Sequence, residues 1–447
     1  MRNYFGTDGV RGRVNQEPMT AEFAMRLGRT AGHVLTRHLS HKPHILIGKD
    51  TRLSGYMLES ALCAGLTAQG MNVLLVGPVP TPAVAYLTRS LRADAGVVLS
   101  ASHNPADDNG IKFFAGDGFK LPDEVEHDIE RLMDNLPALP EPSDIGKAFR
   151  IDDARGRYVE FCKASLPRGF RLDGLKVVID CANGAAYDVA PRALAELGCD
   201  VVPLHADPDG LNINLGCGST HPEIMCQRVV ETGADVGFAL DGDADRVIAC
   251  DAEGRIVDGD KVIAILAEHQ LRHGNLRGGA VVTTIMSNMG LERHLGSMGL
   301  SMHRASVGDR YVLEMMQANH CNLGGEQSGH IIMLDCNTTG DGLISALQLL
   351  YAMTDMGKQL SALGGGLELF PQKLWNVVLP ERIRLEEESG VQQALRDAER
   401  QLGDAGRVSV RMSGTEPKIR IMVEAADESV MLEVGQNLVE RIQSLVG

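Results

Sequence analysis

The stretch Ala95-Gly-Val-Val-Leu-Ser-Ala-Ser-His-Asn-Pro105 carries a short apolar run directly into a polar turn. The apolar half is typical of a buried β-strand, and the turn presents Ser102 and His103 where that strand ends. The stretch Gly237-Phe-Ala-Leu-Asp-Gly-Asp-Ala-Asp-Arg246 repeats this design. Its turn carries three carboxylates, those of Asp241, Asp243 and Asp245. Strands that end in reactive side chains favour an α/β fold, in which ligands usually bind at the carboxyl edge of the sheet.

The sequence around the first stretch alternates strand-like and helix-like segments. Short apolar runs that favour strands occupy residues 44–48, 72–77, 95–99 and 111–114. Residues 59–69 favour a helix, and residues 20–39 place apolar side chains three and four positions apart, as in a helix with one buried stripe. A similar rhythm recurs from 175 to 246 and from 260 to 353. We therefore predict three variations on one α/β plan.

Two segments divide the chain. A proline-rich stretch at 136–143 predicts a boundary near residues 140–155, and Gly364-Gly-Gly366 is typical of a hinge. After the hinge, the segments that favour strands or helices are 374–379, 386–402, 407–412, 418–424 and 428–445. Because 447 residues are too many for one hydrophobic core, we expect three or four domains, the last of them a small α+β domain.

Composition restricts location and partners. No apolar run approaches the roughly 20 residues of a membrane span, and the polar N-terminus lacks the features of a secretory signal, so we expect a cytoplasmic protein. The net charge of −16 argues against nucleic acid as a partner. Nine cysteines without a Cys-x-x-Cys pair fit neither a disulfide framework nor a zinc site, so we expect free thiols.

The three aspartates predict a cation site. An EF-hand is excluded, since Arg246 and Ala252 stand where its loop needs Gly and Glu. A solvated acidic turn is the alternative, but three clustered carboxylates repel one another without a cation. We favour one magnesium ion, with a phosphate oxygen on Ser102 as a further ligand. Arg246 either orients the phosphate or balances charge.

Ser102 is either a nucleophile or an ordinary turn serine. The chain has no Gly-x-Ser-x-Gly elbow, which argues against hydrolase chemistry, and no Walker-type loop, which argues against a P-loop kinase. The separate aspartate cluster instead favours a phosphorylated serine, because a phosphoserine depends on a metal ion more than it depends on a histidine base. A hydroxyl nucleophile with a carboxylate-bound cation points to phosphoryl transfer.

Two further loops carry binding groups. Arg411-Met-Ser-Gly-Thr-Glu-Pro-Lys-Ile-Arg420 sets hydroxyls and a glycine between two arginines, as in a phosphate cradle, although an ordinary hairpin turn would look the same. Gly324-Gly-Glu-Gln-Ser-Gly-His330 offers the groups that bind sugar hydroxyls. His103 and His330 each have two interpretations, a turn residue whose hydrogen bonds are satisfied locally or a residue that contacts the substrate. The sequence favours neither. On physical grounds alone, four cationic residues are better interpreted as surface charges than as catalysts. They are Arg11, Lys49, Arg52 and Lys112.

Taken in order, five motifs resemble those of the α-D-phosphohexomutases across nearly the whole chain. The motifs are Gly6-Thr-Asp-Gly-Val-Arg-Gly12, Ser100-Ala-Ser-His-Asn-Pro105 with Asn109-Gly-Ile-Lys112, Asp241-Gly-Asp-Ala-Asp-Arg246, Gly325-Glu-Gln-Ser-Gly-His330 and Arg411-Met-Ser-Gly-Thr-Glu-Pro417. Gln327, Asn212-Ile-Asn214 and Cys217-Gly-Ser-Thr220 are similar to the glucosamine branch of the family. No catalytic position departs from the family pattern.

The resemblance implies four domains around a central cleft, three of them α/β with mixed sheets flanked by helices and the fourth a smaller α+β domain. We expect them at 1–150 with the phosphoserine loop, 151–253 with the metal loop, 254–366 with the sugar loop and 367–447 with the phosphate loop. The implied reaction interconverts glucosamine 6-phosphate and glucosamine 1-phosphate. It passes through phosphorylated Ser102 and a 1,6-bisphosphate, and it supplies UDP-N-acetylglucosamine and cell-wall precursor synthesis.

The resemblance also assigns roles to residues. The implied catalytic group is Ser102, Arg11, Lys112, His103 and His330, and the implied metal ligands are Ser102, Asp241, Asp243 and Asp245. The implied substrate-binding residues are Arg246, Asp309, Glu326, Ser328, Arg411, Ser413, Gly414, Thr415 and Arg420. As the base for the attacking hydroxyl it suggests Arg11 or Lys112, and a lysine in that role needs a pKa well below the usual value of about 10.4.

The expected cofactors are one Mg²⁺ ion and a primer, either glucosamine 1,6-bisphosphate or glucose 1,6-bisphosphate. The expected partner is a small-molecule sugar phosphate, with a homodimer as an option and with neither nucleic acid nor membrane. Two other functions stay open. One is a phosphoglucomutase or phosphomannomutase with the same chemistry, and the other is a catalytically silent sugar-phosphate binding protein.

Overall fold

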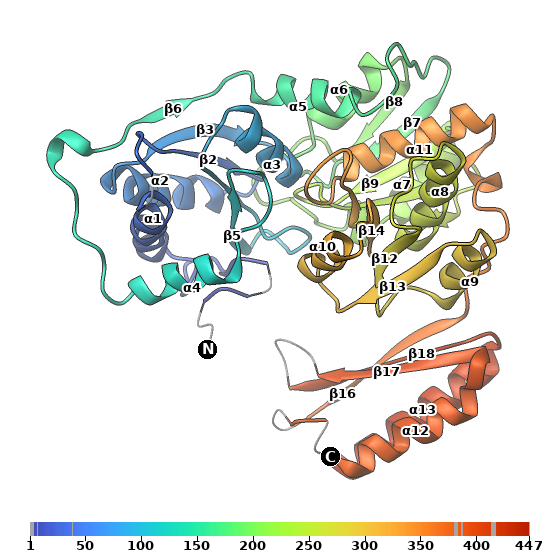
Figure 1. The fold of residues 1–447 in the computed structure, drawn as a ribbon. Coiled ribbons are helices and arrows are strands. Elements are labelled where there is room, and N and C mark those ends of the chain that lie inside the picture. Colours follow the sequence, from blue (N-terminus) through green and yellow to red (C-terminus); the bar gives the residue numbers. More distant parts are fainter. Residues whose placement is uncertain are drawn as a thin grey trace. The chain divides into compact units, whose positions relative to one another are not determined.

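The computed structural model describes residues 4–6, 8–37, 39–379, 383–385, 388–412 and 417–446. The chain forms two compact units. Unit 1 comprises Met1–Thr284 and His303–Gly365, and unit 2 comprises Ile285–Met302 and Gly366–Gly447. Figure 1 draws the helices and strands of both units. Within the described ranges, no helix is both long enough and apolar enough to cross a membrane.

The first sheet of unit 1 follows the predicted alternation. Its elements are β1 (Val10–Arg13), α1 (Ala21–Thr36), β2 (His44–Lys49), α2 (Ser54–Ala68), β3 (Asn72–Pro78), α3 (Thr81–Ser90), β4 (Ala95–Leu99), β5 (Asp108–Ala115), α4 (Asp123–Leu132) and β6 (Ala148–Arg150). The six strands lie in the order β1-β5-β4-β2-β3-β6. β4, β2, β3 and β6 run parallel, whereas β5 runs antiparallel to both of its neighbours, so the sheet is mixed.

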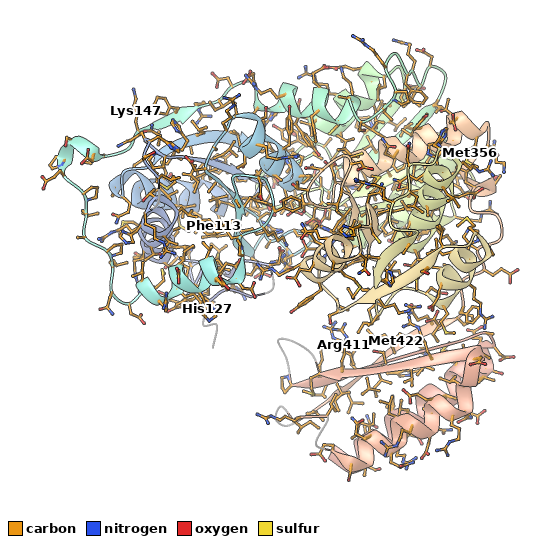
Figure 2. All side chains as sticks on the ribbon, in the orientation of Figure 1. Phe113, His127, Lys147, Met356, Arg411 and Met422 are labelled. Carbon is orange, nitrogen blue, oxygen red and sulfur yellow. The ribbon has the colours of Figure 1, made fainter. Side chains whose placement is uncertain are left out.

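Helices α1 and α2 pack closely against each other and cover one face of this sheet (Figure 1). The Thr20 hydroxyl caps α1 by accepting a hydrogen bond from the Phe23 amide at 3.2 Å. The helices meet where a Cβ on Gly28 would lie 2.5 Å from the Leu62 carbonyl oxygen, so that position requires glycine. The apolar stripe of α1 and Phe113 of β5 share one core (Figure 2).

The second sheet has the order β11-β10-β9-β7-β8. Its elements are α5 (Ala154–Lys163), β7 (Lys176–Asp180), α6 (Val189–Glu196), β8 (Asp200–Leu204), α7 (Glu223–Thr232), β9 (Val236–Leu240), β10 (Val247–Asp251) and β11 (Ile256–Val257). β7 is parallel to β8 and β9, and β10 runs antiparallel to β9. Because β9 is completely buried and ends at Leu240, the aspartate turn begins directly at the carboxyl end of a core strand.

The third sheet has the order β13-β12-β14-β15. Its elements are α8 (Gly259–Arg272), β12 (Ala280–Thr284), α9 (Met289–Ser297), β13 (Ser301–Ala305), α10 (Asp309–Ala318), β14 (Leu323–Gly325), β15 (Ile331–Met333) and α11 (Gly342–Met356). β12 is parallel to β14, and β14 is antiparallel to β15. The predicted sugar loop is therefore the connection between β14 and β15.

Unit 2 contains an antiparallel sheet in the order β16-β18-β17. Its elements are β16 (Gln372–Val378), α12 (Ser389–Leu402), β17 (Gly406–Met412), β18 (Lys418–Ala425) and α13 (Glu428–Val446). The buried faces of α12 and α13 share one core with the sheet. The predicted fold class, three mixed α/β sheets flanked by helices with a smaller α+β part at the C-terminal end, is confirmed.

β1 and β6 are two of the strands that the sequence did not predict. β1 has the sequence Val-Arg-Gly-Arg, which lacks apolar alternation, and it exists because it pairs with β5. Arg11 therefore stands on a strand rather than in a glycine turn. β6 is fully exposed, and it joins the edge of the first sheet by pairing with β3. The proline-rich stretch before it therefore lies within the span of the first sheet.

Candidate active site

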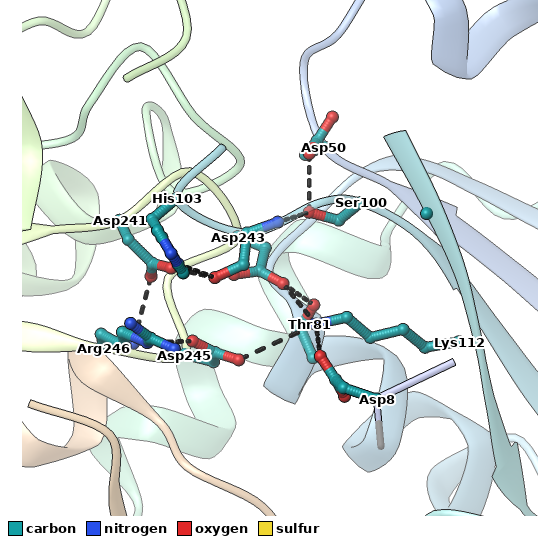
Figure 3. Close-up of polar contacts among 12 residues, drawn as sticks. Asp8, Asp50, Thr81, Ser100, His103, Lys112, Asp241, Asp243, Asp245 and Arg246 are labelled. Atoms are coloured by element: carbon teal, nitrogen blue, oxygen red, sulfur yellow. Dashed lines mark hydrogen bonds and ion pairs between the residues drawn. The ribbon is translucent and has the colours of Figure 1, made fainter. Parts of the chain in front are cut away.

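Ser102 stands in a strained turn after β4. Its φ is +53°, in the left-handed region that a non-glycine residue occupies only when its surroundings require it. The Ser102 amide donates to the Ser100 hydroxyl at 2.9 Å, and that hydroxyl donates to Asp50 Oδ2 at 2.7 Å (Figure 3). Ser102 is only 1% exposed. The turn thus fixes the serine hydroxyl in one direction.

Arg52 is the main support of this turn. Its guanidinium is fully buried and pairs with Asp50 at 2.8 Å. It also donates to the carbonyl oxygens of Ser102 at 3.0 Å and Asn104 at 2.8 Å. Two more carbonyl oxygens, those of Pro105 and Asp108, accept from the same guanidinium. The expectation that Lys49 and Arg52 are surface charges is wrong, because Lys49 is also buried and pairs with Glu59.

The Ser102 hydroxyl faces the aspartate turn that follows β9. It donates a hydrogen bond to Asp241 Oδ2 at 2.5 Å. Asn214 also binds the serine turn, since its side-chain amide nitrogen donates to the carbonyl oxygens of Ser102 at 2.8 Å and Asn104 at 2.9 Å. The structure therefore brings the predicted nucleophile and the predicted metal loop together, although 139 positions separate Ser102 from Asp241 in the sequence.

Asp241, Asp243 and Asp245 form a carboxylate cluster with one oxygen of each within 4.8 Å of the others. All three side chains are buried. Asp243 Oδ2 accepts from Thr81 at 2.7 Å and from Lys112 at 3.2 Å, whereas Asp243 Oδ1 is buried and accepts no hydrogen bond from any residue that the structure describes (Figure 3). A buried, unpartnered carboxylate oxygen among oxygen neighbours fits a hard divalent cation.

The charges of the cluster support the same conclusion. Burial, together with repulsion from Asp245 and Asp243, raises the pKa of Asp241 well above its usual value. Burial also opposes the charge of Asp245, but His330 and Lys112 lower the pKa of that carboxyl below its usual value. A cation between the three oxygens would relieve the repulsion that Asp241 experiences.

Lys112 connects the carboxylate cluster to the N-terminal motif. Its Nζ lies 3.1 Å from Asp8 Oδ2 and 3.2 Å from Asp243 Oδ2, and its side chain is 3% exposed. Asp8 also pairs with Arg11 and Lys120. Although burial opposes it, the attraction of Asp243 and Asp8 raises the pKa of Lys112 above its usual value. The lowered pKa that a lysine base requires is therefore not found in this arrangement.

The sugar loop lies against the carboxylate cluster. His330 Nδ1 is 3.5 Å from Asp245 Oδ1, and His330 Nε2 is 3.7 Å from Asp309 Oδ2. Asp309 also pairs with Lys120 at 2.5 Å. Glu326 accepts hydrogen bonds from the Gly308 amide at 3.1 Å and the Ser328 hydroxyl at 3.2 Å. Predicted site residues of the third sheet thus meet those of the first and second sheets within unit 1.

Two histidines near the site carry different charges. His103 Nδ1 lies 3.4 Å from the Ser102 hydroxyl, and burial together with Arg246 and Arg11 lowers the pKa of His103 to about 4. For His330, the attraction of Asp245 outweighs burial and raises its pKa to about 9. Arg246, whose Nε is 3.8 Å from Asp245 Oδ1, stands between them as a further cation. At neutral pH, His103 is therefore neutral and His330 is protonated.

In unit 2, Arg411 and Arg420 are cross-strand partners on β17 and β18. Arg411 is labelled in Figure 2. The Nε of Arg420 is buried and has no hydrogen-bond partner within the described ranges. Two like charges opposite each other destabilise a strand pair unless an anion lies nearby. The three predicted phosphate ligands Ser413, Gly414 and Thr415 lie outside the described residues.

Several polar residues around the site were not singled out by the sequence analysis. They are Asp8, Asp50, Thr81, Lys120 and, for its contact with the serine turn, Asn214. One signal was available, because Asp50-Thr-Arg52 follows directly on Lys49, the last residue of the buried strand β2. Polar side chains at the end of a core strand are candidates for a site by the same argument that selected Ser102.

Family models match most of the chain. The phosphoglucomutase/phosphomannomutase models match as alpha/beta/alpha domain I at residues 2–138, domain II at 157–254, domain III at 258–368 and the C-terminal domain at 374–441. The chain therefore belongs to the phosphoglucomutase/phosphomannomutase family of phosphohexomutases. It is a mutase, an enzyme of the isomerase class that acts on small-molecule substrates. A metal ion and a bisphosphate intermediate belong to the chemistry of this family.

Individual proteins of this family show how similar the chain is to known mutases. The chain is 56% identical over 442 residues to "Phosphoglucosamine mutase" of Paracoccus denitrificans (strain Pd 1222), with 99% of each chain covered. A phosphoglucomutase/phosphomannomutase family protein of Burkholderia thailandensis has a similar structure, with a TM-score of 0.82, 25% identity and 98% and 97% of the two chains covered. An N-acetylphosphoglucosamine mutase of Aspergillus fumigatus, solved with GlcNAc-6P and magnesium, shares the fold with a TM-score of 0.68, 16% identity and coverage of 100% and 96%.

Proposed function

We propose that the chain interconverts glucosamine 6-phosphate and glucosamine 1-phosphate as a phosphoglucosamine mutase. The observation that carries the chemistry is the Ser102 hydroxyl, which lies 2.5 Å from Asp241 Oδ2 at the carboxylate cluster. The name of the Paracoccus denitrificans relative, at 56% identity over the full length, supports the choice of amino sugar. Activated amino sugar for cell-wall precursors is the corresponding product.

The proposed reaction has two transfers. Phosphorylated Ser102 gives its phosphoryl group to the 1-hydroxyl of glucosamine 6-phosphate, so the serine–phosphorus bond breaks, a bond to oxygen 1 forms and the hydroxyl proton leaves. The product of this step is glucosamine 1,6-bisphosphate. After the bisphosphate has turned over, its 6-phosphoryl group returns to Ser102 and glucosamine 1-phosphate is released. The strained turn and Arg52 keep the serine in place for both transfers.

Asp241, Asp243 and Asp245 are proposed to hold one Mg²⁺ ion, with an oxygen of phosphorylated Ser102 as a further ligand. The bound ion supplies charge neutralisation for the phosphoryl group. The support is the donor set of hard carboxylate oxygens, in which the buried Asp243 Oδ1 has no hydrogen-bond partner among the described residues. The magnesium complex of the Aspergillus fumigatus protein agrees with this choice of ion.

The cations around the cluster are proposed to stabilise the charge of the moving phosphoryl group. Arg11, Lys112 and His330 are protonated at neutral pH, since the pKa of Lys112 is raised and that of His330 is about 9. His103 is neutral and 3.4 Å from the Ser102 hydroxyl, so it is the group that can accept a proton there. Of these four side chains only His103 is unprotonated at neutral pH, so His103 is proposed as the general base, with Arg11, Lys112 and His330 as neighbouring cations.

The remaining predicted residues are proposed to bind the sugar phosphate. Glu326 and Ser328 stand on the sugar loop. Glu326 is half-buried and Ser328 is exposed, so their polar atoms are accessible to hydroxyl groups. Arg246 and Asp309 border the carboxylate cluster through Asp245 and His330. The non-reacting phosphate is assigned to Arg411, Ser413, Gly414, Thr415 and Arg420.

The first test is the conversion of glucosamine 6-phosphate to the 1-phosphate with Mg²⁺ and a primer, glucosamine 1,6-bisphosphate or glucose 1,6-bisphosphate. Glucose and mannose 6-phosphates are assayed in parallel. We expect the highest kcat/KM for the amino sugar. A higher kcat/KM for either plain hexose would retain the mechanism and replace the proposed substrate with that of a phosphoglucomutase or phosphomannomutase.

The second test is Ser102→Ala, with Ser60→Ala on the exposed face of α2 as the matched control. We expect the first variant to lose at least about 10⁴-fold in kcat, since the nucleophile is removed, and the control to keep full activity. Near-normal turnover by Ser102→Ala would exclude the phosphoserine mechanism. A cytoplasmic location, a homodimer and the four domain limits given above stay predictions.

A further inference from the structure

Helices α8 and α11 lie side by side in unit 1 (Figure 1), and their C-terminal ends bring together three side chains that the proposed reaction does not use. His269 stands in the last turn of α8, and His273 follows the end of that helix. The two are four positions apart and therefore on the same face. Asp355 stands on α11 next to Met356, which is labelled in Figure 2. We name these three residues the histidine cluster.

The donor atoms of the histidine cluster converge on one point. Nε2 of His269 lies 3.3 Å from Asp355 Oδ2, and Nε2 of His273 lies 2.9 Å from the same oxygen. One ligand atom from each residue lies within 4.8 Å of the other two. Around a tetrahedral zinc ion with bonds of about 2.0–2.1 Å, neighbouring ligand atoms are about 3.3 Å apart. The two measured separations therefore suit ligands that share one ion.

Aromatic contacts hold the two imidazoles in these positions. The ring of Tyr351, one turn before Asp355 on α11, lies 4.8 Å from His269 at an interplanar angle of 84°. It lies 6.3 Å from the ring of His273 at 25°. Phe170 packs against the other side of this arrangement, with its ring 5.1 Å from Tyr351. Because its side chains stand at the ends of two packed helices and contact aromatic rings, the site keeps its ligand geometry without a large rearrangement.

The accessibility of the three side chains also suits a metal ligand set. The His269 side chain is 5% exposed, whereas those of His273 and Asp355 are 38% and 34% exposed. The open side leaves room for a water molecule as a fourth ligand.

From this geometry we propose that His269, His273 and Asp355 form a second metal site, which binds one zinc ion or a similar borderline divalent cation. Two imidazoles and one carboxylate form a common zinc ligand set, whereas Mg²⁺ prefers oxygen ligands alone. The site therefore differs in selectivity from the carboxylate cluster, and the two do not compete for the same ion.

The position of the histidine cluster indicates what the ion does. Both helices begin at loops of the candidate active site, since the Gly259 amide donates to the Gln327 carbonyl and the Gly342 amide donates to the Ala244 carbonyl, each at 3.0 Å. α8 has 14 residues and is about 21 Å long, so the cluster lies too far from Ser102 to take part in chemistry. The bound ion joins the distal ends of the two helices and stabilises unit 1.

The decisive measurement is a Zn²⁺ titration of the intact chain against a chromophoric chelator, with saturating Mg²⁺ present to occupy the carboxylate cluster. We expect one tightly bound zinc ion per chain. His273→Ala and Asp355→Asn should each weaken zinc binding by at least about 100-fold, since removal of a ligand costs no less than removal of a residue that merely orients one. The matched control is His127→Ala, an exposed histidine on α4 (Figure 2), which should bind zinc as the parent does.

Two further readouts make the assignment specific. Bound Co²⁺ should show the visible absorption of a tetrahedral nitrogen and oxygen site without a thiolate charge-transfer band. Zn²⁺ should raise the Tm of the parent but not of His273→Ala, while the kcat of both proteins stays the same. Melting in the presence of a chelator establishes that the variants fold.

Three outcomes would overturn the proposal. The first is the absence of a tight zinc ion in the parent, and the second is equal zinc affinity in His273→Ala, Asp355→Asn and the parent. The third is a thiolate band in the Co²⁺ spectrum, which would assign the ion to a cysteine, for example Cys217 beside Asp180 and His205.

Discussion

The serine turn of unit 1 and the arginine pair of unit 2 are built in opposite ways. Around Ser102, buried cations lie next to buried carboxylates, as Arg52 next to Asp50 and Lys112 next to Asp243. In unit 2, Arg411 and Arg420 stand opposite each other on adjacent strands, and the buried Nε of Arg420 has no hydrogen-bond partner within the described ranges. The first region alternates buried charges of opposite sign, whereas the second places two positive charges on adjacent strands.

This difference suggests a division of labour. A network whose members fix one another positions reacting atoms, and a defect in it should lower kcat. An arginine pair that binds the non-reacting phosphate contacts it in the ground state and in the transition state alike, so a defect in it should mainly raise KM. Variants in each region can therefore test whether the two functions are separate.

The largest effect is expected for Asp243→Asn in the carboxylate cluster. The change removes the charge of a buried side chain that pairs with Lys112 and whose Oδ1 accepts no hydrogen bond within the described part of the chain. We expect kcat to fall by about 10²–10³-fold, because metal charge stabilisation is worth several kcal/mol. Steady-state kinetics across a Mg²⁺ series measure this loss, and the exposed Asp107→Asn is the control. An unchanged Mg²⁺ dependence would exclude Asp243 as a ligand.

The second prediction concerns Arg52→Met, which leaves Asp50 buried without its partner. Removal of one member of a buried ion pair costs about 3–5 kcal/mol, so we expect a clearly lower Tm together with a lower kcat. The control is Arg13→Met, whose ion pair with Asp107 is largely exposed and contributes little. Normal kcat with a lowered Tm would show that Arg52 supports the fold of unit 1 without positioning Ser102.

The same comparison explains what could be predicted from the sequence. The strands that end at Leu99 and Leu240 were predicted because both runs are apolar and are followed by polar turns. The strands around Arg411 and Arg420 were predicted for the same reason. Local pattern is sufficient in these places, because burial of a strand depends on its own residues.

Other features needed information that a single sequence does not contain. The burial of Arg52 depends on carbonyl oxygens of residues 102–108, which only the folded turn brings together. β1 exists because β5 offers a pairing edge, not because Val10–Arg13 has an apolar pattern. Likewise, the charge of Lys112 depends on Asp8 and Asp243 from two distant segments. Long-range pairing and electrostatics, rather than propensity, determine these features.

A smaller effect is expected for Arg420→Ala in the arginine pair. Loss of one charge-assisted hydrogen bond to a phosphate is worth about 1.5–3 kcal/mol, so kcat/KM should fall roughly 10–150-fold, mostly through KM. The control is Arg441→Ala, which removes an exposed ion pair of α13. A fall in kcat at unchanged KM would contradict the proposed division between the two regions.

The smallest effect concerns His205 in the loop after β8, whose Nδ1 lies 3.0 Å from the buried Asp180. The contact with the Asp180 carboxylate raises the pKa of His205 in the folded state. Because the folded pKa is the higher one, this stabilisation is fully present below the unfolded pKa of about 6.5 and is lost as the pH rises through the folded pKa. The side chain is 27% exposed, so we expect no more than about 1.5 kcal/mol.

The measurement is the Tm of the parent and of His205→Gln at pH 5.5 and pH 9, with the exposed His221→Gln as the control. The parent should exceed His205→Gln in Tm at the lower pH, and the gap should close at the higher pH. The His205 carbonyl accepts from Asn183, whose own carbonyl accepts from Thr51, so this loop is linked to the segment that carries Arg52. A gap that does not change with pH would mean that His205 supports this link by packing rather than by its charge.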